Sequence, residues 1–429
     1  MYISCIILCC NIFLLATVRN TMLLYFLDFN MTNTTKLTLP YNERDKFLSW
    51  LKSAFVIMFI TSILFILFKY QPDVNALDNR EIQLAEQLIK ERKNDPKRLR
   101  VILLWNQVWG IKNWGYSRLP SVDFIAHGCE ETNCIVTDNK ALLREADAVI
   151  FHAYDNMKNV PHFRLPHQRY VFMVHEPPCN IPQHKYDFLN SAFNWTQTYR
   201  WDSDIPMPYG VVCKRDKPKQ INYDEILQKK TKPVAWMVSN CEAPSKRLEY
   251  VKELMKYIQV DVYGKCAKLL GQNNVCGRKT RDQCMQMLGR EYRFYLAFEN
   301  CLTKDYITEK YLDMLSINIV PVVRGDGNYS SIGPANSFIN TRNFKSPKDL
   351  ASYLLELSQD DNKYVKYLKW KEKYNFDPEG LECSNVEFGH CLLCKKLNNL
   401  SEPKKFYKDI KKWHGKCREA DDIPYGENA

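Results

Sequence analysis

Several patterns that would assign a sequence quickly to a known class are missing from this chain. It has no G-x-G-x-x-G stretch, which excludes the usual fingerprint of a dinucleotide-binding site. It has no internal repeat, so nothing indicates a repeat architecture. Its C-terminal part has one C-x-x-C pair, Cys391 and Cys394, and lacks the second close pair typical of a structural zinc site. Zinc binding by this pair with Cys383 and Cys417 stays open as the weaker alternative to disulfides.

Cysteine and positive charge, in contrast, are plentiful. The 429 residues include 16 cysteines, which favours an oxidising compartment over the cytosol. The net charge of +11 leaves nucleic acid, an anionic membrane surface and an anionic small substrate open as partners. The length and a hydrophobic content of 45% allow two or three packed domains.

An uncharged apolar stretch, residues 53–68, lies between Lys52 and Lys69. Its flanking residues extend it, and we predict a transmembrane signal-anchor over residues 53–70. Basic residues on its N-terminal side place residues 1–52 in the cytosol and the rest of the chain in the lumen. The short length suits the thinner membranes of the early secretory pathway.

A second apolar segment, residues 2–18, lacks the basic region of a signal peptide. It is either a second span or an artefact of the predicted start. We favour the artefact, because translation from Met31 gives an ordinary single-span protein.

After the span, the charged and apolar-poor residues 71–98 indicate a stem. Strands and helical stretches then alternate, which predicts parallel α/β sheets. A polar, lysine-rich stretch suggests a division into two domains, residues 99–220 and 221–380. Residues 381–429 form a cysteine-containing basic tail, which we expect to be solvated. Its interleaved aromatics would suit nucleic acid, but a lumenal location argues against that partner.

The densest polar cluster lies in residues 294–325. The pattern predicts a strand, a polar loop, a helix over 308–316 and a second strand over 319–323. In an open α/β sheet, ligands bind at the carboxyl ends of the strands. A capped core helix with solvated charges is the alternative. The polar side chains at this edge are Glu299, Asn300, Asp305, Tyr306, Glu309 and Lys310.

Two further residues lie where a site would need them. The predicted strand 169–174 ends in His175-Glu176-Pro177-Pro178, which leaves Glu176 at a carboxyl edge, the position of a general base or of an exposed loop carboxylate. Arg247 lies in the first turn of a predicted helix, 245–258. A cation is unfavourable there unless an anion such as phosphate binds beside it.

Two α/β domains with cations on one and a carboxylate on the other suit a nucleotide-sugar glycosyltransferase. The reaction needs a base for the acceptor hydroxyl and charge stabilisation for the departing nucleoside diphosphate. A metal-dependent alternative would use Asp202-Ser203-Asp204 as a D-x-D motif. That tripeptide precedes Pro206 and Pro208 rather than following an apolar strand, which weakens the alternative.

The stretch FYLAFENCLTKDYITEKYLDMLSINIVPVVRG resembles the F-E-N…D-Y-x-T-E-K…V-P-V-V-x-G signature of the α1,3-fucosyltransferases. CEETNCIVTDNK with ADAVIFH, YVFMVHEPP, TYRWDSDIPMPYG, AWMVSNC and VDVYGKC resemble further blocks in the family's order, across roughly residues 100–395. The resemblance implies two Rossmann-like domains facing a cleft (GT-B type). It implies inverting transfer of L-fucose from GDP-fucose to the 3-hydroxyl of a GlcNAc on a glycoprotein N-glycan, by a single-pass type II protein of the Golgi membrane. No metal is needed for the chemistry, although Mn²⁺ or Mg²⁺ often raises activity in the family.

Carried over to this sequence, the resemblance implies that Glu176 is the general base and that Asp202 and Asp204 are structural. It assigns seven residues to the donor, with the two cations on the diphosphate and Glu309 toward the fucose: Arg247, Asn300, Tyr306, Glu309, Lys310, Tyr263 and Ser239. HEPP stands where many relatives have E-S-P, which puts the acceptor-facing contour in doubt. The innermost GlcNAc of an N-glycan and a distal N-acetyllactosamine GlcNAc both stay open as acceptors.

Cysteines and sequons complete the predictions. CLLC resembles the closing C-x-x-C of the family, which supports disulfides over zinc. The disulfide candidates are Cys129, Cys134, Cys383, Cys391, Cys394 and Cys417, and the glycosylation candidates are Asn194, Asn328 and Asn399. Thirteen cysteines follow the span, so at least one is free or pairs with another chain.

Overall fold

A computed structural model describes Ala54 and residues 98–107, 124–125, 128–154, 161–182, 184–187, 192–272, 276, 280–377 and 389–423. Apart from Ala54 and Arg98, the predicted span and stem lie outside these residues, as does the apolar segment 2–18. Among the described residues, no helix has the length and apolar character needed to cross a membrane.

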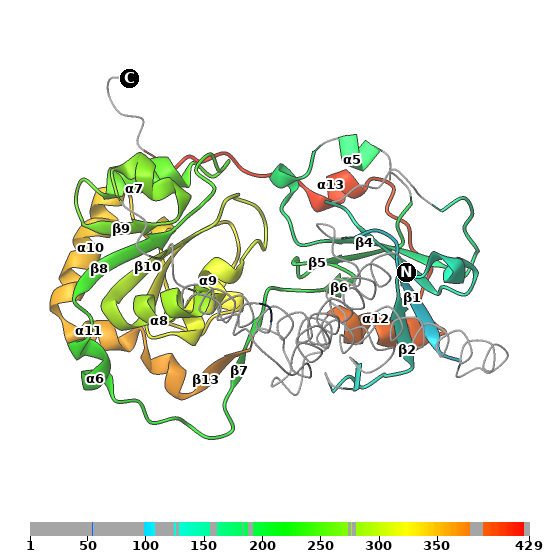
Figure 1. Ribbon diagram of the computed structural model, residues 1–429, viewed down its shortest axis with the longest axis horizontal. Helices are drawn as coiled ribbons and strands as arrows, with labels where there is room; N and C mark the ends of the chain where they lie inside the picture. The colour runs from blue at the N-terminus through cyan, green and yellow to red at the C-terminus, as the bar shows by residue number, and fades with distance from the viewer. Residues whose placement is uncertain are drawn as a thin grey trace, which may run out of the picture. The chain divides into compact units, whose positions relative to one another are not determined.

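The first sheet has six parallel strands in the order β2-β1-β3-β4-β5-β6 (Figure 1). The sequences of β1 (RVILL) and β4 (RYVFMV) are almost continuously apolar, because both faces of a parallel sheet are covered. The strands are β1 (Arg100–Leu104), β2 (Cys134–Thr137), β3 (Ala148–His152), β4 (Arg169–Val174), β5 (Trp195–Thr198) and β6 (Ile205–Pro206).

The second sheet has five parallel strands in the order β12-β11-β10-β8-β9. Side chains alternate along each strand: Val234 and Trp236 of β8 belong to one core cluster, and Ala235 belongs to the other. The strands are β8 (Lys232–Met237), β9 (Val260–Tyr263), β10 (Tyr292–Phe298), β11 (Val320–Arg324) and β12 (Ile339–Asn340). One cluster includes α7 (Arg247–Leu254) and α10 (Pro347–Gln359), and the other includes α8 (Arg281–Glu291) and α9 (Glu309–Ser316). The α/β fold with parallel sheets is therefore as predicted.

The C-terminal residues are not the solvated tail that we expected. Helix α12 (Gly389–Asn398) buries Leu393 against one face of the first sheet. Before and within α13 (Ile410–His414), Tyr407 and Ile410 pack into the cluster on the other face. In Figure 1 the orange α12 and the red α13 accordingly lie beside strands of the first sheet. Most of the lysines in this C-terminal segment are exposed, but the apolar side chains complete a core made mostly by residues 101–193.

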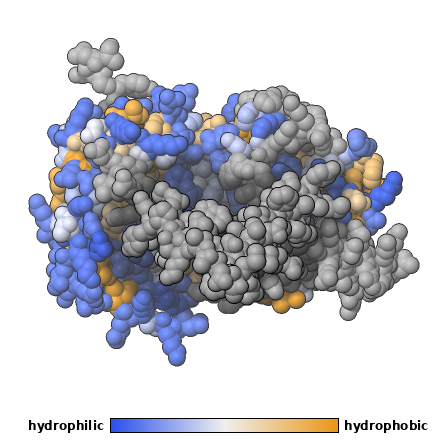
Figure 2. Space-filling model, viewed as in Figure 1, coloured by the Kyte–Doolittle hydropathy of each residue, from blue (hydrophilic) through white to orange (hydrophobic). Residues whose placement is uncertain are grey.

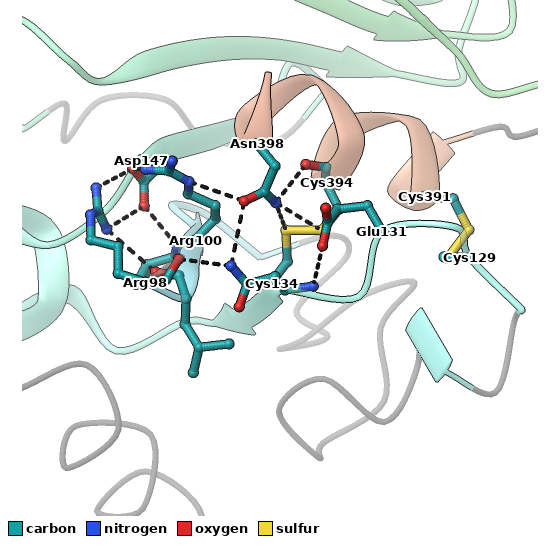
Figure 3. Close-up of a disulfide and its surroundings, with 12 residues drawn as sticks. Arg98, Arg100, Cys129, Glu131, Cys134, Asp147, Cys391, Cys394 and Asn398 are labelled. Atoms are coloured by element: carbon teal, nitrogen blue, oxygen red, sulfur yellow. Dashed lines mark hydrogen bonds and ion pairs between the residues drawn. A yellow bond between two sulfur atoms is a disulfide. The ribbon is translucent and has the colours of Figure 1, made fainter. Parts of the chain in front are cut away.

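Two disulfides attach α12 to the first sheet. Cys129 pairs with Cys391 and Cys134 with Cys394, so the C-x-x-C cysteines bind two different partners (Figure 3). The disulfide prediction is confirmed for these four, and the zinc alternative is wrong for them. Beside the second bridge, the Asn398 side chain accepts a hydrogen bond from Arg100 Nε at 3.3 Å (Figure 3). Cys383 lies outside the described residues.

Residues 363–374, whose aromatic spacing suggests one helix, are divided among three elements. Helix α11 (Asp361–Lys366) ends early, and a 3-10 turn covers Lys369–Glu372. Tyr374 then begins β13 (Tyr374–Asp377), which pairs antiparallel with β7 (Val211–Lys214). The predicted linker near residues 210–232 thus contains β7 and α6 (Tyr223–Gln228). The remaining short helix is α5 (His184–Asp187).

The three glycosylation candidates differ in exposure. Asn194 is buried, with 1% of the residue exposed, and its side-chain amide donates to the Lys405 carbonyl at 2.8 Å, so the folded domain does not present it for glycosylation. Asn328 and Asn399 are exposed. Hydrophilic residues cover most of the described surface on the face in Figure 2, and hydrophobic residues form small groups.

Candidate active site

A cavity of about 700 Å³ is lined by residues at or beyond the carboxyl ends of strands in both sheets. That volume suits a ligand of drug or cofactor size. It has thirteen lining residues: His152, Met173, His175, Glu176, Met207, Tyr209, Asn240, Arg247, Asn300, Tyr306, Glu309, Lys310 and His390. Six of the eight predicted site residues are among them.

The topology of the second sheet explains why its residues meet here. Strand β8 lies between β9 and β10, so the strand order reverses beside it, and ligands bind at such a switch point. Asn240 follows β8 and Asn300 follows β10. Ser245 joins the two loops, since its N–H donates to the Asn300 carbonyl at 3.0 Å and its hydroxyl to the Glu299 carbonyl at 2.7 Å.

Arg247, the first residue of α7, is 5% exposed. Its guanidinium donates to the Phe298 carbonyl at 2.8 Å and to the Asn240 carbonyl at 3.2 Å, which fixes it across both loops. Its Nε is buried and has no hydrogen-bond partner among the described residues. Burial lowers the pKa of Arg247, although Glu299 opposes this effect. A buried cation with a spare donor beside a cavity is suited to an anionic ligand.

Lys310 lies in the first turn of α9 within a network of charges. Its Nζ contacts Glu309 at 3.0 Å and the fully buried Glu299 at 3.3 Å, and it donates to Thr308 Oγ1 at 2.8 Å. Burial lowers the pKa of Lys310, but the two carboxylates outweigh burial and raise it. For Glu309, burial raises the pKa, and Lys310 outweighs that effect and lowers it. The pair is therefore charged, and the Glu309 side chain remains 46% exposed.

Glu299 is a residue whose role the sequence did not reveal. Its carboxylate accepts hydrogen bonds from the N–H of Thr308 at 2.8 Å and from the Thr308 hydroxyl at 2.9 Å. Thr308 is the N-cap of α9, so Glu299 fixes the start of the helix that carries Glu309 and Lys310. Burial raises the pKa of Glu299, with Lys310 opposing.

Asn300 and Tyr306 complete the wall formed by the second sheet. The Asn300 Oδ1 is buried and has no hydrogen-bond partner among the described residues. Tyr306 is 2% exposed and makes edge contacts with the rings of Tyr199 and Tyr209, at centroid distances of 5.0 and 6.3 Å. Within the described part of the chain, Asn300 Oδ1 and Arg247 Nε thus leave one acceptor and one donor without partners at this cavity.

Glu176 reaches the cavity from the first sheet, just after β4. Its Oε2 accepts a hydrogen bond from Asn180 Nδ2 at 2.7 Å. The neighbouring His175 contacts the Met207 carbonyl through Nε2 at 2.9 Å, and its own carbonyl accepts from the Tyr209 hydroxyl at 2.8 Å. Burial lowers the pKa of His175 to about 4. The glutamate is therefore held on a fixed loop beside a neutral imidazole.

Two predicted donor residues do not line the cavity. Tyr263 is 3% exposed, and its hydroxyl bonds to that of Tyr292, which donates to Asp261. Its ring fills the core of the second sheet, because the last residue of a buried parallel strand faces a covering helix layer. Ser239 is exposed and lies next to the lining residue Asn240. Tyr263 therefore packs in the core and is not among the residues that line this cavity.

Asp202 and Asp204, the metal alternative, are occupied by protein partners. Asp202 pairs with Arg200 at 2.7 Å and Lys304 at 2.9 Å. Desolvation raises the pKa of Asp202, but these cations outweigh it and lower the pKa to about 2. Asp204 accepts from Lys405 at 2.7 Å and from the Tyr407 hydroxyl at 2.7 Å. Both carboxylates tie separate segments together, and neither is among the lining residues.

Comparison with known proteins agrees with this geometry. Residues 97–210 match the family description "Fucosyltransferase, N-terminal", and residues 227–413 match "Glycosyltransferase family 10 (fucosyltransferase) C-term". The chain belongs to glycosyltransferase family 10. Both halves of the cavity lie within the matched residues, including Glu176 in the first and Arg247 and Lys310 in the second.

This fucosyltransferase family member is similar to several named proteins. It is 37% identical to glycoprotein 3-alpha-L-fucosyltransferase A of Drosophila melanogaster, over 74% of this chain and 60% of that protein. It is 34% identical to alpha-(1,3)-fucosyltransferase C of the same species, over 74% of this chain and 79% of that protein. A human 3-galactosyl-N-acetylglucosaminide 4-alpha-L-fucosyltransferase is 40% identical over 56% of this chain and 65% of its own length. A crystal structure of an α1,3-fucosyltransferase with GDP-fucose aligns with a TM-score of 0.46 at 18% identity, over 72% of this chain and 92% of that one.

Proposed function

We propose that this fucosyltransferase moves L-fucose from GDP-fucose to the 3-hydroxyl of a GlcNAc residue on a glycoprotein glycan, with inversion at the anomeric carbon. The observation that carries the proposal is the cavity itself. It combines a carboxylate from the first sheet with two cations and two unpartnered buried polar atoms from the second. The relatives aligned over 74% of this chain are named as 3-alpha or alpha-(1,3) enzymes, which supports the choice of hydroxyl.

In this proposal, the Glu176 carboxylate takes the proton of the acceptor hydroxyl. The oxygen then attacks the anomeric carbon of fucose from the face opposite the GDP, and the bond from that carbon to the diphosphate breaks. The hydrogen bond from Asn180 and the two prolines after Glu176 hold the base on its loop.

The departing GDP gains negative charge on its diphosphate, and Arg247 and Lys310 supply the compensating cations. Both are fixed before substrate arrives: Arg247 by two carbonyls, and Lys310 by Thr308 and two carboxylates. The unpartnered Arg247 Nε gives the leaving group an additional donor. Glu309 and Asn300 complete the contacts to the sugar and its nucleotide, and Tyr306 closes the wall.

The same proposal includes a GT-B arrangement with domains over residues 99–220 and 221–380. The two parallel sheets support it, as do the family matches, which end at residue 210 and resume at residue 227. Packing of α12 and α13 on the two faces of the first sheet adds these C-terminal helices to the first domain. A signal-anchor over residues 53–70 would hold these domains in the Golgi lumen, and the disulfides support an oxidising compartment.

The test is a panel of glycan acceptors incubated with GDP-fucose and the detergent-solubilised full chain. We expect release of GDP and addition of one fucose, with linkage analysis locating it on O3 of GlcNAc. A panel containing both N-glycan core and N-acetyllactosamine acceptors distinguishes the two acceptor classes. Fucose on O4 would contradict the regiochemistry, and no transfer to any member would contradict the proposal.

A second experiment measures fucose transfer with and without divalent cations. Since the charge compensation comes from Arg247 and Lys310, transfer should continue in EDTA, and added Mn²⁺ or Mg²⁺ should at most stimulate it. Complete loss in EDTA with recovery on Mn²⁺ would contradict this part of the proposal.

A further inference from the structure

Three cysteines from three separate segments meet directly beside the base. Cys179 follows Glu176 on the loop after β4, Cys301 follows the lining residue Asn300, and Cys417 lies beyond α13. Their sulfur atoms all lie within 4.8 Å of one another. An antiparallel bridge between Leu302 and Arg418 joins the last two segments. The cluster thus links the base loop, the donor loop and the C-terminal segment.

The cluster holds one cysteine more than disulfides can use. The Cα separations of Cys179 from Cys301 and from Cys417, 6.8 and 5.7 Å, both permit a disulfide, but one sulfur forms only one disulfide. Among the described residues, four other disulfides join cysteines outside the cluster, and Cys213 is disulfide-bonded as well. One of the three cysteines is therefore a thiol whenever Cys179 is paired within the cluster.

Backbone geometry favours Cys417 as the resting partner of Cys179. The Cα atoms of Cys179 and Cys417 are 5.7 Å apart, within the commonest range for a disulfide, whereas those of Cys179 and Cys301 are 6.8 Å apart, at its upper limit. The N–H of Cys179 also points at the Cys417 sulfur, at 3.1 Å. In the resting pairing the thiol belongs to Cys301, which is fully buried.

Asn180 connects this thiol to the base. Its Oδ1 lies 3.4 Å from the Cys301 sulfur and accepts from a thiol there, and its Nδ2 donates to Glu176 Oε2 at 2.7 Å. An amide flipped by half a turn would aim its oxygen at the carboxylate, so a donor at Cys301 selects the productive orientation. A disulfide sulfur has no proton to donate.

We propose that Asn180 is a positioning residue for Glu176, and that the pairing of Cys179 decides whether the Cys301 thiol orients it. This inference rests on the proposed role of Glu176 as general base. When Cys179 is bonded to Cys417, the Cys301 thiol holds the Asn180 oxygen and the amide N–H holds the carboxylate. When Cys179 is bonded to Cys301, the Asn180 oxygen loses its donor, and a disulfide joins the loop that carries Glu176 to the loop that carries Asn300.

The two pairings interconvert by thiol–disulfide exchange without an outside oxidant. The Cys301 thiolate, formed by loss of its proton, attacks the Cys179 sulfur. The bond from Cys179 to Cys301 forms while the bond from Cys179 to Cys417 breaks, and Cys417 leaves as a thiolate that takes up a proton. One disulfide and one thiol are present before and after the step.

The pairing can be measured without reference to activity. The full chain is denatured in acid with excess N-ethylmaleimide to trap thiols, digested without reduction and mapped by mass spectrometry. We expect a peptide linking Cys179 to Cys417, with alkylated Cys301, as the major species. Alkylation of all three cysteines, or Cys301 found only in a disulfide, would overturn the assignment.

Kinetics on paired variants test the positioning role. Cys301→Ser keeps a donor for the Asn180 oxygen and Cys301→Ala removes it, and both leave the bond between Cys179 and Cys417 intact. We expect Cys301→Ser to retain more activity than Cys301→Ala, whose kcat should fall about tenfold, the size expected for losing a hydrogen bond to a charged group. Asn180→Ala should match the alanine variant, with little change in KM for GDP-fucose.

Cys417→Ser forces Cys179 to pair with Cys301 and should therefore lower kcat about as much as Cys301→Ala does. Equal kcat in Cys417→Ser and Cys301→Ser would overturn the effect of pairing. A wild-type kcat in Asn180→Ala, or a fall in kcat/KM that comes from a raised KM for GDP-fucose alone, would overturn the positioning role even though fucose transfer stands. If the wild-type protein transfers no fucose, the proposed function fails, and the peptide map alone still decides the pairing.

Discussion

Glu176 tests the chemistry at the scale of a single residue. Glu176→Gln keeps the shape of the side chain and its contact with Asn180 but removes the proton acceptor. We expect kcat for fucose transfer to fall by about 10²- to 10⁴-fold, while binding of GDP-fucose, measured by calorimetry, stays near the wild-type value. Glu225→Gln, on the exposed α6, is the matched control. Retained turnover in Glu176→Gln would remove this residue as the base.

Arg247 tests the donor side. Arg247→Lys keeps the charge but cannot span the Phe298 and Asn240 carbonyls with one planar fork, and it loses the unpartnered Nε. We expect the Kd for GDP to rise about tenfold or more, from the loss of charge-assisted hydrogen bonds. The exposed Arg290→Lys should leave that Kd unchanged. Equal GDP affinity in both variants would contradict a diphosphate contact at Arg247.

The residues that sequence reasoning identified differ in a physical respect from those that it missed. Glu176, Arg247 and Lys310 could be found because each lies at a predictable place, a strand end or a first helical turn, and within a recognisable motif. Glu299 was found at the predicted site edge but its role was not, and Asn180 was not found, since both roles depend on partners that folding brings together, such as the thiol of Cys301 for Asn180. Tyr263 lies in the core and not among the residues that line the cavity, because a tyrosine at a strand end is suited to either place.

At the scale of elements, the two disulfides on α12 should stabilise the fold cooperatively. Cys129–Cys391 and Cys134–Cys394 close nearly the same long loop, with sequence separations of 262 and 260. While one bridge remains, removing the other opens only a small ring, at a cost of about 2–3 kcal/mol. Removing both opens the long loop as well, at a further cost of about 5 kcal/mol.

We therefore expect Cys129→Ser with Cys391→Ser to remain folded, and likewise Cys134→Ser with Cys394→Ser. The quadruple variant should fail to fold, because its loss approaches the total stability of an ordinary domain. Thermal unfolding and secreted yield measure both effects. Cys276→Ser with Cys284→Ser, a separation of 8 residues, is the control for a local bridge. Strictly additive losses would contradict the nested-loop argument.

The elements that sequence reasoning located well are those with one strong local signal. The predicted strand 169–174 coincides with β4, and α9 begins one residue after the predicted helix start because Thr308 is its N-cap. The prediction of one helix over residues 363–374 is wrong. Aromatic residues three and seven positions apart also occur where a short helix, a turn and a strand each contribute one of them to the core. Tyr374 is in a strand only because β7, far away in sequence, pairs with β13.

At the scale of the whole molecule, two buried histidines tie stability to pH. Burial lowers the pKa of His175 to about 4 and that of His414 to about 3, both below the ordinary value near 6.5. At pH values between these lowered pKa values and about 6.5, the unfolded chain binds more protons than the folded one. The free energy of unfolding therefore rises with pH in this range and falls on acidification below about pH 6.5. Each histidine contributes up to about 1.4 kcal/mol per pH unit.

Urea unfolding at pH 5, 6 and 7 measures this slope. His414→Gln still offers an acceptor to the Tyr186 hydroxyl but has no imidazole to protonate, so its slope should be smaller by about one proton. The exposed His162→Gln should keep the wild-type slope. Identical slopes in all three proteins would show that His414 is not the group responsible.

The C-terminal residues decide whether the first sheet is stable by itself. Leu393 on one face and Ile410 on the other are fully buried against strands that lie far earlier in the sequence, and Asp422 pairs with Arg324 of the second sheet at 2.6 Å. Composition alone predicted a solvated segment because lysine dominates it, but its few apolar side chains are spaced to cover both faces of one sheet.

A chain ending after residue 388 should therefore leave the apolar faces of β1 and β4 exposed and fail to unfold cooperatively. A chain ending after residue 423 keeps every described contact of this segment and should melt as the full chain does. A point variant separates the effect of packing from the loss of the two disulfides. Leu393→Ala removes only buried apolar groups and should lower the free energy of unfolding by about 2–5 kcal/mol. Leu400 is 82% exposed, so Leu400→Ala should leave that free energy almost unchanged. Cooperative, wild-type-like melting of the chain ending at residue 388 would show that the first sheet does not need its C-terminal helices.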